Sequence, residues 1–207
     1  MVYLSLPRNF IKAMSKAEKT KSFIIEKTAP IFNMKGYAGT SMQDMTDATG
    51  LTKGSIYGNF KNKDDVALAV FEYNRAKMVA LFSTEISKRK TNAEKLLAYP
   101  DLYENFFSKN FLQGGCPIMN TAIEADDTHP KLKMAAQRAI LEWKDSIAYI
   151  IERGKESNEF KKTTNSEEIA LSIISMIEGA VMITKLTGKI DSLKLILHTL
   201  KKLINDL

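Results

Sequence analysis

Hydroxyl, lysine and glycine residues cluster between positions 40 and 63 in an order suited to contacting DNA. Lysines neutralise phosphates and release condensed counterions, while short hydroxyls and the N–H groups at helix starts bind phosphate oxygens. Gly54 and Gly58 would each cost a helix about 1 kcal/mol relative to alanine, which close approach to DNA could compensate. Gly58 could equally end the helix. The candidate DNA-binding residues are Thr40, Ser41, Thr52, Lys53, Gly54, Ser55, Tyr57, Asn59 and Lys63.

Two short helices around a tight turn must position these side chains. Gly50 can adopt a left-handed turn conformation without steric cost, and Thr52 can cap the helix that follows. After Thr52 only Ile56 and Phe60 are clearly apolar at helical spacing, so the rest of this second helix is free to enter a major groove. The apolar positions of the first helix recur three residues apart: Met42, Met45 and Ala48. The pattern predicts a helix-turn-helix.

A longer motif carries a family resemblance. The order T-S-x-x-x-M-x-x-A-x-G-L-T-K-G-S-I-Y-x-x-F-x-x-K, from Thr40 to Lys63, resembles the DNA-binding domain of the tetracycline-repressor (TetR/AcrR) family. A preceding helix extends the resemblance back to about Lys16. It implies that the hydroxyls, the lysine after the threonine, the tyrosine and the later lysine contact DNA. The chain departs from the family at Gly58 and Asn59, where larger aromatic or histidine side chains are common, so no base preference is implied.

The distribution of charge agrees with a DNA-binding N-terminal part. The chain has a formal net charge of +6. Residues 1–75 hold 11 Lys/Arg against 7 Asp/Glu, a net of +4, and residues 76–207 hold 19 against 17, a net of +2. The excess is densest in the smaller part, where phosphate binding would need it. A merely solvated basic surface would give the same totals.

Composition indicates a cytoplasmic protein. The single cysteine, Cys116, excludes an intramolecular disulfide and a Cys₄ zinc site. No apolar run approaches the roughly 18 to 20 residues that span a bilayer, so no membrane partner is expected. Pro7, Arg8 and Asn9 interrupt the N-terminal apolar run, which makes a poor signal peptide. Residues 1–14 are expected to form an extra N-terminal arm.

Helical periodicity continues through nearly the whole chain and predicts an all-α fold. A three-helix head, the helix-turn-helix DNA-binding domain, is expected at 15–62, and a larger helical ligand-binding and dimerisation domain at 63–207. The first helix should run from about Lys16 to Met34 and end at an αL cap on Gly36. Pro100 should kink or restart a helix, and Pro130 should begin one.

The last two helices predict a dimer. Between Glu167 and Leu186 apolar residues occupy two faces, separated by a strip of small residues, and one chain has few elements left to cover so much apolar surface. A wholly intrachain core is the alternative. The predicted interface residues are Ser172, Ser175, Gly179, Met182, Ile196, Leu200 and Leu203.

The resemblance implies a ligand pocket inside the helical body, which the spacing alone does not show. Aromatic and methionine residues at helical spacing usually pack a core, and Glu178 could instead lie at the dimer interface. Tyr103 and Glu178 are the candidate polar anchors. The other candidate lining residues are Phe106, Phe107, Phe111, Met119, Ile123, Trp143 and Met176.

No catalytic constellation is evident, and no cofactor is expected. Glu124, Asp126, Asp127 and His129 could approach a metal, but the same run supplies acids and a cap ahead of a helix that begins at Pro130. The latter interpretation is favoured. Cys116 could be a thiol sensor, although a buried, inert thiol is the better interpretation.

These features predict a homodimeric repressor that is not an enzyme. Two recognition helices would enter successive major grooves of a near-palindromic double-stranded DNA operator, about 34 to 36 Å apart. A small, largely apolar effector would weaken that binding. The alternatives are a helix-turn-helix protein controlled by a protein partner without a small ligand, or a small helical metal-binding protein or enzyme.

Overall fold

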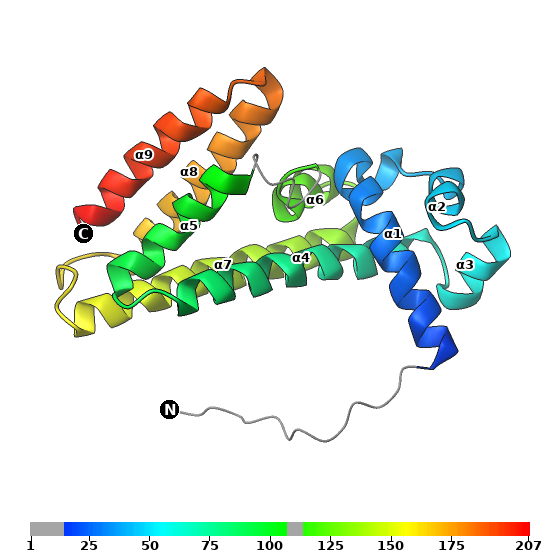
Figure 1. Cartoon of the computed structure of the whole chain (residues 1–207), viewed down its shortest axis with the longest axis horizontal. Helices are drawn as coiled ribbons and strands as arrows, with labels where there is room; N and C mark the ends of the chain where they lie inside the picture. Colours follow the sequence, from blue (N-terminus) through cyan, green and yellow to red (C-terminus); the bar gives the residue numbers. More distant parts are fainter. Residues whose placement is uncertain (1–14, 107–113) are drawn as a thin grey trace.

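The computed structural model describes residues 15–106 and 114–207, and every regular element within them is a helix. This confirms the all-α prediction. Figure 1 shows the head of α1 to α3 at one end, joined to a longer helical body. The helices are α1 (Lys16–Gly39), α2 (Met42–Thr49), α3 (Lys53–Asn59), α4 (Lys63–Ser87), α5 (Asn92–Phe106), α6 (Pro117–Ala125), α7 (Pro130–Glu156), α8 (Ser166–Thr187) and α9 (Ile190–Asn205).

Local capping explains the helix-turn-helix. The Ser41 hydroxyl accepts from the Asp44 N–H at 3.0 Å, and the Asp44 carboxylate accepts from the Ser41 N–H, which forms a capping box at the start of α2. Gly50 ends α2 in the left-handed conformation with φ 68°, and Thr52 caps α3. Both predicted roles are confirmed. The turn therefore follows directly from its own residues.

The first helix differs from its prediction. It does not end at Met34 but continues to Gly39, with a kink at Gly36. Gly36 has φ 72° and ψ −178°, which is not the αL conformation of the predicted cap but a region open essentially to glycine alone. The kink turns Tyr37–Gly39 out of the line of α1, toward α6 and the start of α4.

Two long helices connect the ends of the molecule. α4 and α7 run side by side away from the head (Figure 1), and ion pairs from Arg75 to Glu142 and from Arg138 to Glu72 join them. α5 continues through Pro100, so the helix does not restart there. Buried Leu96, Tyr99 and Tyr103 hold one face of α5 against the body on both sides of the proline.

The body ends in the pair α8 and α9. α8 buries eight residues, among them Ile173, Ile177 and Val181, yet leaves other apolar side chains exposed. Among the helices of residues 15–106 and 114–207, α8 alone is long and apolar enough to cross a membrane by length and composition, with a mean hydropathy of 1.8. The expectation that no apolar run approaches that length is therefore wrong for α8. The core helix of a soluble protein passes the same test, and 39% of the tested segment is buried.

Candidate DNA interface, effector cavity and dimer face

The recognition helix α3 is attached by one side and open on the other. Ile56 is fully buried, and Phe60 follows it into the core just after the helix ends. Lys53, Gly54 and Gly58 are exposed, and Tyr57 is 38% exposed. The Lys53 ammonium lies 6.0 Å from the centre of the Tyr57 ring. This face offers a cation, a phenol and unobstructed backbone to a major groove.

The predicted hydroxyls divide into available and occupied groups. Thr40 is fully buried and its hydroxyl donates to the Gly36 carbonyl at 2.6 Å, so it is not free for a phosphate. This corrects the prediction for Thr40. Ser41 and Thr52 are exposed and accept cap hydrogen bonds. The Ser41 hydroxyl also donates to the Asp44 carboxylate at 2.8 Å, whereas the Thr52 hydroxyl can still donate its proton. The Asn59 amide donates to the Ser55 carbonyl at 2.9 Å, which ties its nitrogen to the helix.

Lys63 lies at the start of α4 and belongs to the junction between head and body. Its ammonium is 4.4 Å from the centre of the Tyr37 ring. The Tyr37 hydroxyl donates to Asp64, which raises the pKa of Tyr37 to about 12 and lowers the pKa of Asp64. Tyr37 also meets the His129 ring edge-on, with 4.6 Å between ring centres. The prediction did not include Tyr37, because its partners are distant in the sequence.

The acidic run before α7 has a structural role. The His129 Nδ1 accepts from the Leu132 N–H at 3.2 Å and caps α7, whose first residue is Pro130. The predicted helix start at Pro130 is confirmed. No group of three His, Cys, Asp or Glu side chains that could hold a metal occurs among the described residues. Glu124, instead of facing a metal, points at the head.

A cavity of about 190 Å³ lies between α4, α5 and α7. Its walls are mainly aromatic and aliphatic, with the Arg75–Glu142 ion pair and two serines among the polar groups. An engineered apolar cavity of about 150 Å³ binds benzene, so this space suits a molecule of one ring or slightly more. The lining residues are Arg75, Met78, Val79, Phe82, Ser83, Ile86, Tyr99, Ile118, Ala139, Glu142, Trp143 and Ser146.

Of the predicted pocket residues whose side chains the structure describes, Trp143 alone lines this cavity. Tyr103 is buried behind it, with its ring 6.3 Å from the Trp143 ring, and Met119 and Met176 pack against the core. Ile123 is 67% exposed on α6, so its prediction as a lining residue is wrong. Phe107 and Phe111 lie outside the described residues, as does the side chain of Phe106. Phe82 and Tyr99 were missed because their helical spacing does not distinguish a cavity wall from a filled core.

A buried acid lies on α8, close to Cys116. Both Glu178 carboxylate oxygens are inaccessible to solvent. Burial raises the pKa of Glu178 to about 7, and the neighbouring Cys116 thiol opposes this rise. Burial, and then the carboxylate, raise the pKa of Cys116 well above its usual value. The thiol is therefore protonated and buried, as the sequence interpretation favoured.

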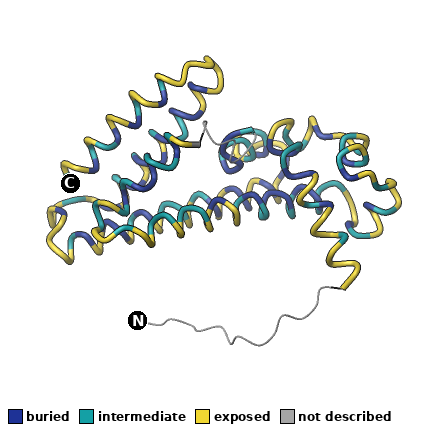
Figure 2. The backbone as a smooth tube through the Cα atoms, in the orientation of Figure 1, coloured by how far each residue is buried: buried dark blue, intermediate teal, exposed yellow. Residues whose placement is uncertain are grey.

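The outer side of α8 and α9 carries exposed apolar side chains among polar ones. In Figure 2 much of α9 and the end of α8 are exposed. Met182 is 48% exposed, Ser175 is exposed, and Ser172 and Gly179 are partly exposed. Leu200 is fully buried within its own chain, which corrects its assignment to the interface, whereas Ile196 and Leu203 are partly buried. Leu171, Leu186 and Leu195 are exposed apolar residues that the predicted interface omitted.

Comparisons with known families agree with both parts of this geometry. Residues 24–70 match the family described as "Bacterial regulatory proteins, tetR family". Residues 92–200 match the family described as "Tetracyclin repressor-like, C-terminal domain". The two matches correspond to the helix-turn-helix head and to most of the helical body. They are matches to transcriptional regulators rather than to enzymes.

Individual relatives support the same assignment. The structure is similar to that of a TetR-family transcriptional regulator from Cytophaga hutchinsonii, at 43% identity and a TM-score of 0.88, over 93% of this chain and 96% of that one. A TetR transcriptional regulator from Chloroflexus aurantiacus is similar at 34% identity and a TM-score of 0.88, over 92% and 96%. The HTH-type transcriptional repressor DhaR from Mycobacterium sp. (strain GP1) is 22% identical over 169 residues, 80% of this chain and 82% of the relative. The chain belongs to the TetR family of DNA-binding transcriptional regulators.

Proposed function

We propose that this regulator is a cytoplasmic homodimeric repressor that leaves a near-palindromic operator when a small apolar molecule binds its body. The open face of α3 carries the proposal, because it presents Lys53, Tyr57 and bare glycine backbone together. Two such helices related by a dyad would read half-sites about 34 to 36 Å apart. Repression is the function named for the mycobacterial relative.

The residues proposed to contact DNA are those whose side chains or backbone are exposed on the head. Lys53 and Tyr57 would bind phosphate or base edges, while the Thr52 hydroxyl and the N–H groups at the starts of α2 and α3 would bind phosphates. Ser41 would bind phosphate only after its hydroxyl leaves the Asp44 carboxylate. Lys63 remains a proposed phosphate ligand at the start of α4. Gly54, Ser55 and Asn59 would bring the helix backbone close to the groove.

A lysine substitution tests the DNA interface. Lys53→Ala should weaken binding to an operator selected from random duplex DNA and reduce the slope of log affinity against log salt by about 1. Fluorescence anisotropy over a range of salt concentrations measures the slope. Lys90→Ala, just beyond the end of α4 that lies away from the head, removes the same charge at an exposed position and should leave the slope unchanged. Equal slopes for Lys53→Ala and the wild type would place α3 away from DNA.

The uncovered face of α8 and α9 supports the dimer. Leu171, Met182 and Leu186 recur along α8 at helical spacing, and Leu195 lies exposed on α9. Exposed apolar clusters of this kind mark protein interfaces. A second copy of the chain is the natural occupant, since dimerisation is typical of the family.

The cavity between α4, α5 and α7 supports the effector. A ligand that prefers a body shape incompatible with the operator spacing would weaken DNA binding. A coupling of about 1 to 3 kcal/mol, or 5- to 150-fold in affinity, would suffice. The aromatic walls and the size favour a flat, largely apolar molecule of one or two rings.

Filling the cavity with a larger side chain tests whether it binds an effector or is only a gap in the packing. Small molecules that copurify with the wild type, identified by mass spectrometry, should release it from the selected operator. Ser83→Trp, at the cavity wall, should retain DNA binding and lose at least tenfold in effector response. Thr84→Trp, at the next and exposed position of α4 and outside the lining, is the control. An unchanged response in Ser83→Trp, or a protein without any copurifying effector, would favour control by a protein partner instead.

A further inference from the structure

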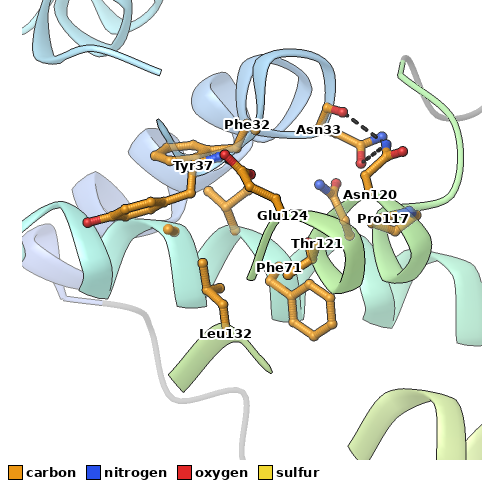
Figure 3. A pocket seen from close by; sticks show the side chains of 13 residues that line it. Phe32, Asn33, Tyr37, Phe71, Pro117, Asn120, Thr121, Glu124 and Leu132 are labelled. Atoms are coloured by element: carbon orange, nitrogen blue, oxygen red, sulfur yellow. Dashed lines mark hydrogen bonds between the residues drawn. The ribbon is translucent and has the colours of Figure 1, made fainter. Parts of the chain in front are cut away.

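We propose that Glu124 of α6 is the positioning residue that sets the angle of the DNA-binding head against the body. Glu124 lies in the body sequence but its carboxylate binds the backbone of the head (Figure 3). Its function is to hold the kinked end of α1 so that the recognition helix keeps one orientation. This inference does not change the DNA-binding activity of the family, but its test by operator spacing rests on the proposed dimer.

Both oxygens of Glu124 are used. One accepts from the Tyr37 N–H at 2.6 Å and the other from the Ala38 N–H at 2.7 Å. Bonds from an N–H to an ionised carboxylate are stronger than neutral ones. A two-point attachment also restrains rotation, which a single hydrogen bond would permit. The carboxylate thus fixes both the position and the direction of this backbone segment.

Gly36 makes the contact possible. A methyl group at this position would overlap the Glu124 carboxylate, and the backbone conformation with φ 72° is also unfavourable for any other residue. The kink turns two consecutive N–H groups outward, where a straight helix would have used them internally. The kink at Gly36 therefore exposes the two N–H groups that the Glu124 carboxylate binds.

Other polar contacts continue the attachment from the head into α8. The Asn33 amide of α1 donates to the Gly115 carbonyl at 2.9 Å, and Asn120 of α6 donates to the Gly114 carbonyl at 2.9 Å. Lys185 of α8 donates to the same Gly114 carbonyl. These contacts connect α8, the helix of the proposed dimer face, to the head through the turn at Gly114 and Gly115 and through α6.

Close packing does not fix this junction by itself. A cavity of about 30 Å³, large enough for about one water, lies among Phe32, Phe71, Leu132 and Glu124. Incomplete apolar contact allows small rotations of the head. Because a dimer reads two half-sites at a set separation, such rotations change which operator spacing fits. The paired hydrogen bonds to Glu124 resist them at the kink, alongside the single hydrogen bonds from Asn33 to Gly115 and from Tyr37 to Asp64.

Glu124→Gln tests the positioning role with little change in shape. Glutamine replaces one acceptor oxygen by an NH₂ group, so one of the two backbone N–H groups loses its partner. Asp127→Asn is the control, because Asp127 is an exposed acid shortly after Glu124 in the chain and the substitution removes the same charge. The DNAs are the selected operator, versions with the half-sites one or two base pairs closer or further apart, and a single half-site.

The expected result is a loss of spacing discrimination. Glu124→Gln should bind the selected operator about tenfold more weakly than the wild type, bind the respaced operators almost as well as the selected one, and keep wild-type affinity for the half-site. Hydrogen exchange should accelerate about tenfold at whichever of the Tyr37 and Ala38 amides loses its acceptor oxygen. Asp127→Asn should behave as the wild type in every measurement.

Three outcomes would overturn the proposal. Wild-type spacing discrimination in Glu124→Gln, despite faster amide exchange, would show that the contact does not position the head. A parallel loss of half-site affinity would show that the contact only stabilises the head. A wild-type protein indifferent to spacing would refute the proposed dimeric operator binding itself, and with it the inference.

Discussion

Gly179→Leu is expected to fold normally, dissociate into monomers and lose operator binding, although its head is untouched. A Cβ atom at Gly179 would meet open space, with no atom beyond the adjacent helix backbone within 4 Å, so we expect the monomer to accommodate the substitution. At a dyad-related helix contact the same side chain would overpack the interface, at a typical cost of about 1 to 3 kcal/mol. A two-fold interface meets the change twice, so dimerisation should weaken by about 30-fold to 10⁴-fold.

Sedimentation at several protein concentrations measures this effect, together with operator affinity. Gln137→Leu adds an exposed leucine to α7, away from α8 and α9, and should remain a dimer of wild-type strength. A folded Gly179→Leu protein that also dimerises like the wild type would place the interface elsewhere. The open space at Gly179 makes this comparison informative, because misfolding is not expected to intervene.

Glu178→Gln is expected to stabilise the protein at neutral and alkaline pH. The pKa of Glu178 is raised from its usual 4.5 to about 7 by burial, so the folded chain retains a proton that the unfolded chain loses. Folded protein then binds more protons than unfolded protein between pH 4.5 and 7, and the free energy of unfolding falls as pH rises through that window. The total loss is about 3 kcal/mol, complete above pH 7.

Urea unfolding at fixed protein concentration, from pH 4.5 to pH 8, tests this prediction. The stability difference between Glu178→Gln and the wild type should grow by up to about 3 kcal/mol toward pH 8. Glu168→Gln changes an exposed acid on the same helix and should show no such trend. A pH-independent difference for Glu178→Gln would mean that the carboxyl group titrates normally in the folded protein.

Short-range features of the DNA-binding head were predictable. Gly50, Thr52 and Ile56 act through neighbours within a few residues, by turn conformation, capping and burial on one helix face. Such interactions depend only on spacing along the chain. The start of α7 at Pro130 was predictable for the same reason.

Side-chain exposure was less predictable, because it depends on which elements pack together. Leu200 and Leu203 look equivalent in the sequence, yet Leu200 is buried within its own chain and Leu203 is only partly buried. Thr40 has the family motif's hydroxyl but turns inward to Gly36. Periodicity identifies an apolar face without identifying what covers it.

The sequence by itself determined the helical class, the helix-turn-helix and the family, because these follow from local spacing and a contiguous motif. Only the tertiary structure decided the position of the cavity, the burial of Glu178 and the contact from Glu124 to the backbone of Tyr37 and Ala38. Glu124 and Tyr37 are 87 residues apart in the chain. Such pairs form when helices pack, and packing depends on the complementary shape of several elements at once.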